Sequence, residues 1–413
     1  MGKDEGWRPL ARPRAPLAIH LPASPFSRLA VAHALAVAGD SLVTMALAGS
    51  LFFSISPGEA RGRVALSLVL TMAPFAVVAP LLGPLLDRVR GGRRLIVVGA
   101  GAGRAVAALM AARVIDGLLL FPAAFVLLVL SKTHAVAKSS LVPTVVDSKE
   151  ELVEANSRLA LLSAVVGLVV ALPGVAVLKL VGSDWVMRLA ALCFAGGGLA
   201  ALRVVQIRPD DPTRRAAAST EVRDAGIRLA GTAMGVLRGA VGFLTFLLAF
   251  GLRREGAPAW IFGVVLVASI VGTLVGNGLA PMARTRLLEE HLLAASLAVV
   301  VAGALGAVYV GGRVGVALGA GVLGASASAG KLSFDSLVQR DAPDAAQGRW
   351  FARFEAVFQL AWVAGALLPV ALEIAIEVGY VALAIACGGA GAVYLTGLRA
   401  ARGHRATGRP STR

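Results

Sequence analysis

Residues 151–180 read ELVEANSRLALLSAVVGLVVALPGVAVLKL. Between Arg158 and Lys179 this stretch holds 20 consecutive residues without a charge. A helix of about 20 apolar residues is long enough to cross the hydrocarbon core of a bilayer. The stretch therefore predicts a membrane-spanning helix.

Apolar runs of similar length lie on both sides of this stretch, separated by short charged or Pro/Gly breaks. The chain of 413 residues is 57% hydrophobic and 15% charged, with a mean hydropathy of +0.78. Such a composition leaves too little polar surface for a water-soluble domain of this size. We predict twelve spans, at 28–55, 62–86, 93–115, 118–138, 151–180, 184–204, 227–252, 257–282, 288–310, 313–338, 347–374 and 377–399.

One long hydrophilic segment, QIRPDDPTRRAAASTEVRD at 206–224, divides the chain near its midpoint. A charged, Pro-containing segment of this kind is typical of a linker. We therefore predict an all-α integral membrane fold of two six-helix bundles, built from paired repeats. The expected parts are a cytoplasmic tail (1–27), a first bundle (28–205), a linker (206–225), a second bundle (226–400) and a second cytoplasmic tail (401–413).

The formal net charge of +16 would suggest nucleic-acid binding in a soluble protein. Here the basic residues gather in alternate loops, with about 28 on one side of the predicted spans and about 8 on the other. The side richer in Lys and Arg faces the cytoplasm. We therefore expect a multi-pass protein of the cytoplasmic membrane, surrounded by lipid, with both termini in the cytoplasm and no nucleic-acid partner.

The loop between the second and third predicted spans reads GPLLDRVRGGRR at 83–94. This pattern resembles the signature loop of the major facilitator superfamily, in which a glycine is followed by Asp-Arg and then by a glycine and two basic residues. The resemblance implies twelve helices in two bundles and a gating loop formed by Gly83, Asp87, Arg88, Gly91, Arg93 and Arg94. Gly83 would let two helices approach closely, and Asp87 at a helix end could pair with arginines. The matching loop of the second half, from Gly276 to Arg286, is an inexact copy, as an old duplication would leave.

Further stretches look like the bacterial drug-efflux branch that includes enterobactin-exporter-like and macrolide-efflux-like carriers. They are GDS at 39–41, LVP at 141–143, EANS at 154–157, and GR at 348–349 with FE at 354–355. The resemblance implies proton-coupled efflux of small amphipathic molecules by a monomer. Proton antiporters often carry a Gly-rich stretch ending in Gly-Pro in the fifth span, and here Gly167 and Leu172-Pro173-Gly174 lack the full set. The prediction of export therefore rests on the branch resemblance alone.

Two charged residues lie near the predicted midplane. Asp40 is about 18 Å beyond Arg28 along its helix, and Arg104 is about 15 Å beyond Arg94. An ionisable group at this depth is either functional or firmly paired. The two residues could form a permanent structural ion pair, in which Arg104 keeps Asp40 charged. Alternatively, Asp40 could lose its partner in one transport state and carry a proton.

Other charged residues in the predicted spans are further candidates. Arg238 lies in the seventh span, which corresponds to a cavity-lining span in the family, and Glu355 lies near the inner surface. We also expect Arg158 and Lys331 to be deep in the membrane, whereas Lys132 and Lys138 should reach the lipid phosphates at the inner face. The excess of deep positive charge favours an anionic or zwitterionic substrate. The transport and coupling candidates are thus Asp40, Arg104, Arg238 and Glu355.

No residues in the sequence suggest catalysis or a cofactor. We find no paired carboxylates, no nucleophile with a base and no Walker-type loop, so we expect a protein that is not an enzyme and does not use ATP directly. The resemblance to the efflux branch implies that the proton gradient is the driving force. His33 and His134 lack metal-ligand spacing, and we expect them to be ordinary hydrogen-bonded helix residues. The alternatives are a carrier of the same fold for a lipid, siderophore or metabolite, working in export or uptake, and a membrane-embedded enzyme or non-transporting scaffold.

Overall fold

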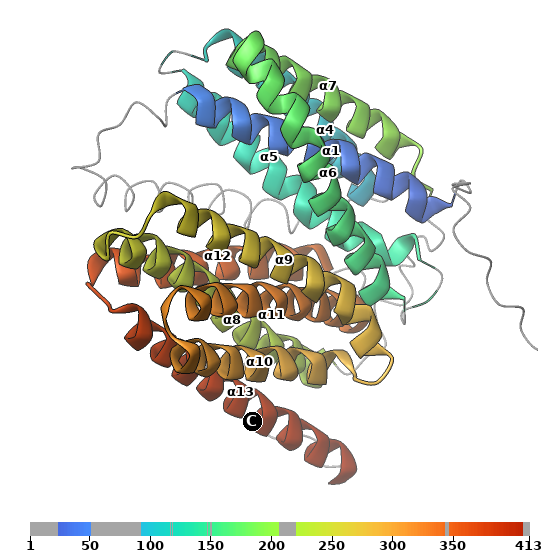
Figure 1. The fold of residues 1–413 in the computed structure, drawn as a ribbon. Helices are drawn as coiled ribbons and strands as arrows, with labels where there is room; N and C mark the ends of the chain where they lie inside the picture. Colours follow the sequence, from blue (N-terminus) through green and yellow to red (C-terminus); the bar gives the residue numbers. More distant parts are fainter. Residues whose placement is uncertain are drawn as a thin grey trace, which may run out of the picture.

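The structure is a computed structural model, and it describes residues 24–50, 92–115, 117, 119–146, 148, 151–205, 220–342 and 347–407. Within that part the chain forms eleven α-helices and one short 3-10 helix (Figure 1). Each of the eleven is long and apolar enough to cross a membrane. Helices dominate because a backbone surrounded by lipid must satisfy its own N–H and C=O groups within the segment.

The helices form two lobes, one above the other in Figure 1. The N-terminal lobe holds α1 (Pro25–Ser50), α4 (Gly92–Arg113), α5 (Leu120–Leu141), the 3-10 helix η3 (Val142–Thr144), α6 (Leu152–Leu180) and α7 (Ser183–Leu202). The C-terminal lobe holds α8 (Thr220–Arg254), α9 (Ala259–Arg284), α10 (Glu289–Val310), α11 (Gly312–Asp341), α12 (Gln347–Ala371) and α13 (Ile376–Thr407).

Eleven of the twelve predicted spans correspond to these helices. The span predicted at 62–86 lies outside the described residues, so the number twelve stays a prediction. Two boundaries differ from the prediction: α8 begins at Thr220, inside the predicted linker, and α13 runs to Thr407, inside the predicted C-terminal tail. Hydropathy marks only the apolar part of a helix, whereas backbone hydrogen bonding continues through polar residues until a residue such as proline stops it.

The two lobes repeat one pattern of helix pairing. In the N-terminal lobe α1 packs on α6 and α7, and α4 packs on α5 and α7. In the C-terminal lobe α8 packs on α12 and α13, and α10 packs on α11 and α13. The pattern matches if α1, α4, α5, α6 and α7 correspond to α8, α10, α11, α12 and α13. Two contacts between the lobes follow the same rule, because α6 meets α11 and α5 meets α12. Helix α6 also meets α9. The lobes are therefore two copies of one arrangement.

The direction of each helix defines two ends of the molecule. Helices α1, α4, α6, α8, α10 and α12 begin at one end, and α5, α7, α9, α11 and α13 finish there. The distribution of Lys and Arg in the sequence predicts that this end faces the cytoplasm. We refer to it below as the predicted cytoplasmic end.

Helices α9 and α11 pack closely because glycines lie at their contact. A Cβ atom added at Gly272 of α9 would run into the backbone carbonyl of Gly321, and one added at Gly276 would run into that of Ala325. Gly272 and Gly276 are four residues apart, on one face of the helix. Small residues at this spacing let two backbones approach in a membrane, where van der Waals packing drives association. The close contact therefore depends on the absence of side chains.

We predict that Gly272→Leu destabilises the protein by about 1–3 kcal/mol or more, because the new side chain would overpack the α9–α11 contact. The matched control is Gly278→Leu in the same helix, where an added Cβ meets nothing within 4 Å. Both changes raise helix propensity equally. Thermal unfolding of the two variants in detergent measures the difference, and equal stability would contradict the packing described here.

Candidate functional site

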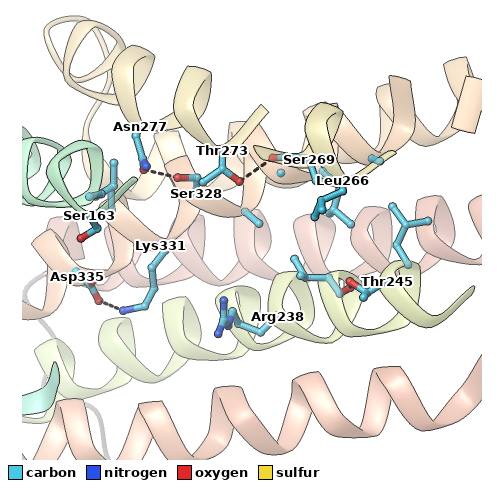
Figure 2. Close-up of a pocket in the computed structure, with 18 of the residues that line it drawn as sticks. Ser163, Arg238, Thr245, Leu266, Ser269, Thr273, Asn277, Ser328, Lys331 and Asp335 are labelled. Atoms are coloured by element: carbon cyan, nitrogen blue, oxygen red, sulfur yellow. Dashed lines mark hydrogen bonds and ion pairs between the residues drawn. The ribbon is translucent and has the colours of Figure 1, made fainter. Parts of the chain in front are cut away.

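A cavity of about 720 Å³ lies between the two lobes. Helices α5 and α6 form its wall on the N-terminal side, and α8, α9, α11 and α12 form its wall on the C-terminal side. Figure 2 shows side chains of several of these helices directed toward the same space. Small-molecule sites in proteins typically have volumes of about 300–1,000 Å³. The cavity is therefore large enough for a small organic molecule.

Among the described residues, five charged side chains line this cavity. They are Lys138 of α5, Arg238 of α8, Lys331 and Asp335 of α11, and Glu355 of α12. Lys331 Nζ lies 2.5 Å from Asp335 Oδ1, and these side chains are 29% and 12% exposed. Lys331, Arg238 and Lys138 are also close enough to Glu355 to interact with it electrostatically. Three basic and two acidic groups leave one positive charge in excess.

Arg238 has a buried side-chain donor without a partner among the described residues. It lies near the middle of α8, and its buried Nε atom has no hydrogen-bond partner within the described part of the chain. Figure 2 shows the guanidinium between the Lys331–Asp335 pair and the Thr245 side of the cavity. A buried donor without a partner is costly, and an acceptor on a ligand would remove that cost. Arg238 is thus placed to bind an anionic group.

The cavity changes from polar to apolar along its length. Lys331 and Asp335 lie toward the predicted cytoplasmic end, and Thr245 and Leu266 lie at the opposite side of the view in Figure 2. The apolar part is formed by Leu244, Leu248 and Leu252 of α8 and by Phe262, Val265 and Leu266 of α9. Hydroxyl groups of Ser269, Thr273 and Ser328 lie between the two parts. The lining therefore matches an amphipathic ligand.

Hydrogen bonds between the lobes close the cavity at the predicted cytoplasmic end. Asn156 Nδ2 of α6 donates to Gln339 Oε1 of α11 at 2.7 Å, and Gln339 Nε2 donates to the carbonyl of Ser139 in α5 at 2.8 Å. The Ser157 hydroxyl of α6 donates to the carbonyl of Asn277 in α9. Asn156, Ser157, Asn277 and Gln339 are all buried. The EANS stretch at 154–157 and the start of the predicted second-half loop therefore meet at this closure.

The ion pair predicted between Asp40 and Arg104 is present, but it does not line the cavity. Arg104 Nη1 lies 3.2 Å from Asp40 Oδ2, with side chains 1% and 42% exposed. The guanidinium also stacks over the ring of Phe194, 4.5 Å from its centroid, and its Nε donates to the carbonyl of Ala100. Arg104 is thus held on several sides inside the N-terminal lobe, whereas Asp40 is only half-buried.

A pair of buried histidines adjoins the cavity wall in the N-terminal lobe. The rings of His33 and His134 stack with centroids 6.4 Å apart, and His33 Nε2 lies 2.8 Å from the hydroxyl of Ser163 in the cavity wall. Neither ring nitrogen of His134 has a hydrogen-bond partner in the described ranges. The expectation of two ordinary hydrogen-bonded helix residues is therefore wrong for His134.

The gating loop is described only in part. Gly83, Asp87, Arg88 and Gly91 lie outside the described residues. Arg93 Nη1 donates to the carbonyl of Ser140 at the end of α5, and Arg94 Nη1 donates to that of Val204 after α7, both at 3.2 Å. These two arginines therefore fasten the start of α4 to its neighbours at the predicted cytoplasmic end.

An ion-pair cluster lies at the corresponding place in the C-terminal lobe. The buried carboxylate of Glu289, in the first turn of α10, pairs with Arg284 at 2.7 Å and with Arg340 at 2.5 Å. Arg340 also pairs with Glu290 and Asp341. The predicted second-half loop, from Gly276 to Arg286, includes Arg284 but not the other members of this cluster, although an acidic first turn directly after a basic loop was a signal for Glu289 and Glu290.

Of the four transport candidates predicted from sequence, the cavity brings together Arg238 and Glu355 and leaves out Asp40 and Arg104. Sequence reasoning missed the role of Lys138, which lies in the cavity wall rather than at the lipid phosphates. It also placed Arg158 too deep, because this side chain is 64% exposed near the start of α6 and pairs with Glu154. The Lys331–Asp335 pair could have been recognised from its spacing of four residues within one helix.

Two mycobacterial proteins are similar to this chain in sequence. It is 32% identical over 385 residues to the uncharacterized protein MT0899 of Mycobacterium tuberculosis (strain CDC 1551 / Oshkosh), which covers 83% of this chain and 68% of that protein. It is 29% identical over 388 residues to the uncharacterized protein ML2143 of Mycobacterium leprae, with 83% and 66% covered. The chain thus spans about two thirds of the length of these relatives. No protein-family model matches the sequence.

Solved structures of transporters share the fold. A bacterial homologue of the iron transporter ferroportin in an outward-facing state superposes with a TM-score of 0.73 at 18% identity, over 91% of this chain and 99% of that one. FucP, a major facilitator superfamily transporter in the outward conformation, gives 0.64 at 14% identity, and the human organic anion transporter MFSD10 gives 0.65 at 15%. Each of these two alignments covers 90% of this chain and 98% of the other. The chain is therefore a multi-pass membrane protein with the fold of major facilitator superfamily transporters, and it belongs to the same family as the Mycobacterium tuberculosis protein MT0899.

Proposed function

We propose that this protein is a secondary transporter that exports a small amphipathic molecule with an anionic or zwitterionic group, in exchange for protons. The observation that carries the proposal is the cavity between the lobes, with charged residues at one end and an apolar wall at the other. A site between two structural repeats is where carriers of this architecture bind their substrates. In the proposal, rocking of the lobes about this cavity opens it to one side of the membrane at a time.

The contacts between the lobes suit such a movement. Among the described residues, the side-chain hydrogen bonds that join the lobes lie at the predicted cytoplasmic end, through Asn156, Ser157 and Gln339. Each contributes about 0.5–1.5 kcal/mol net, so breaking all of them costs only a few kcal/mol. Conformations that differ by a few kcal/mol interconvert and respond to ligands. Closure at this end supports an outward-facing state, the state named for two of the similar structures.

The charges in the cavity support an anionic or zwitterionic substrate. Lys138, Arg238 and Lys331 outnumber Asp335 and Glu355, and Arg238 Nε lacks a partner among the described residues. The apolar wall from Leu244 to Leu252 would receive the hydrophobic part of the molecule. One of the similar structures is described as an organic anion transporter, which agrees with this choice, and another is described as a homologue of an iron transporter.

The Asp40–Arg104 pair is the proposed site of proton coupling. Its position supports this role because Asp40 is half-buried while Arg104 is held by Phe194 and Ala100 independently of Asp40. A helix movement could therefore separate the carboxylate from a guanidinium that stays in place. A carboxylate that loses its partner at membrane depth takes up a proton, because burial disfavours the charged form.

Arg238→Ala should reduce counterflow of anionic amphipathic compounds in proteoliposomes by roughly 10–100-fold, since a hydrogen bond to a charged group contributes about 1.5–3 kcal/mol. Transport should be measured across a compound panel, with and without a pH gradient. The control is Arg188→Ala, which removes a surface arginine paired with Asp184 outside the cavity. Unchanged transport of every anionic compound by Arg238→Ala, or transport of a divalent metal ion alone, would contradict the proposed substrate class.

For proton coupling, Asp40→Asn should abolish substrate-dependent proton release by the purified protein. This variant should also lower the free energy of unfolding by about 1–3 kcal/mol, because it leaves the buried Arg104 without its counter-charge. The expected loss is smaller than for a fully buried pair because Asp40 is 42% exposed. The double variant Asp40→Asn/Arg104→Gln removes both charges and should recover most of the stability without recovering proton release. If proton release returns together with stability, the pair is only a structural tie.

A further inference from the structure

A second large cavity, of about 680 Å³, lies on the C-terminal lobe away from the space between the lobes. It is a groove formed by α8, α12 and α13. Helix α8 packs along both α12 and α13, whereas α12 and α13 make few contacts with each other. The groove therefore runs between α12 and α13, with α8 as its floor. We call it the α8 groove.

The floor of the groove is open because α8 carries glycine there. A Cβ added at Gly235 would meet nothing within 4 Å, so a larger side chain at this position would enter the groove. Gly231 and Gly239 lie one turn away on either side and are covered by Phe354 and by the backbone of Ala361 in α12. Close packing of α12 at these two glycines thus leaves an unfilled space at Gly235.

The walls are apolar and face outward. Val357 and Leu368 of α12 are about half exposed, and Leu383 and Ala386 of α13 line the other side. On a helix that crosses a membrane, exposed apolar side chains of this kind contact lipid. The α8 groove therefore opens toward the hydrocarbon of the bilayer rather than toward the substrate cavity.

Two arginines lie at one end of the groove. Arg228 lies three residues after the start of the α8 span at Ala225, and Arg353 lies six residues after the start of the α12 span at Gln347. Both are exposed, and neither forms an ion pair within the described part of the chain. At depths of about 5–9 Å their side chains can extend to the level of the lipid phosphates. Paired arginines at this level form a ready binding site for a phosphate group.

The length of the groove matches one leaflet. On α8 the lining runs from Arg228 to Phe243, and on α12 it runs from Arg353 to Leu368. Fifteen residues of helix span about 22 Å. Half of the hydrocarbon core is about 15 Å thick, and the head-group region adds several ångströms. A lipid with its phosphate at the arginines would thus place an acyl chain along the whole groove.

We propose that the α8 groove binds an anionic phospholipid of the predicted cytoplasmic leaflet, with its head group on Arg228 and Arg353 and an acyl chain over Gly235. Basic pockets between helices on the cytoplasmic side bind such head groups. The bound lipid would contact the outer faces of α8 and α12, whose other faces carry Arg238 and Glu355. The site is distinct from the substrate cavity and does not depend on the proposed transport activity.

The full chain in nanodiscs of phosphatidylcholine, or of phosphatidylcholine mixed with an equal amount of phosphatidylglycerol, tests the proposal. Lipids retained after transfer to detergent are counted by native mass spectrometry. We expect phosphatidylglycerol to be retained selectively, and Arg228→Gln/Arg353→Gln to weaken its retention roughly 30-fold, about fivefold for each arginine. The control Arg286→Gln removes another exposed arginine at the same end, outside the groove, and should retain phosphatidylglycerol as the unchanged protein does.

A second variant tests the acyl chain. Gly235→Leu should fill the groove and reduce phosphatidylglycerol retention while both arginines remain, and Gly278→Leu, in an exposed position of α9, should not. Equal retention of both lipids, or unchanged retention in the two arginine variants and in Gly235→Leu, would overturn the proposal. Two other results would also overturn it. One is that soluble glycerol phosphate stabilises the protein against heat as well as the lipid does. The other is that the unchanged protein is a dimer that only Gly235→Leu dissociates.

Discussion

The cost of a charged group inside a bilayer governs where this protein can place its polar side chains. Many apolar helix faces are exposed, and three groups of charged side chains among the described residues are turned inward. Asp40 and Arg104 pair within the N-terminal lobe, and Glu289 joins Arg284 and Arg340 at the predicted cytoplasmic end of the C-terminal lobe. Lys138, Arg238, Lys331, Asp335 and Glu355 line the cavity between the lobes. The cavity is thus a place where charge is tolerated because polar partners face it from several helices.

The two lobes share one helix arrangement but carry different chemistry. The described wall of the cavity comes mainly from the C-terminal lobe, with Arg238, Lys331 and Glu355, whereas the N-terminal lobe holds the Asp40–Arg104 pair away from it. The stacked His33 and His134 reach the cavity through Ser163. Under the proposed function, substrate binding and proton binding would belong to different lobes, and the lobe movement itself would connect them.

The sequence predicted the helices well because length and apolar character decide which segments cross a bilayer. It also predicted the Asp40–Arg104 contact. The two helices run in the same direction, and counting residues from their starts places both side chains at a similar depth. It could not predict which face of a helix turns inward, because several spans carry small or apolar residues all round. For that reason Lys138 was assigned to the lipid phosphates and the Asn156–Gln339 contact was missed. The α8 groove depends on the space next to Gly235 being left unfilled, and only the packing of α12 and α13 reveals that.

The Lys331–Asp335 pair has a consequence for how firmly any anion can be held. The two groups are neighbours on one helix turn at 2.5 Å, so Lys331 already has a resident acidic partner that can never diffuse away. An incoming anion must compete with Asp335 for Lys331. When the anion leaves, Asp335 pairs with Lys331 again at once. Under the proposed transport function, such a pair would favour quick release of the anion over tight binding.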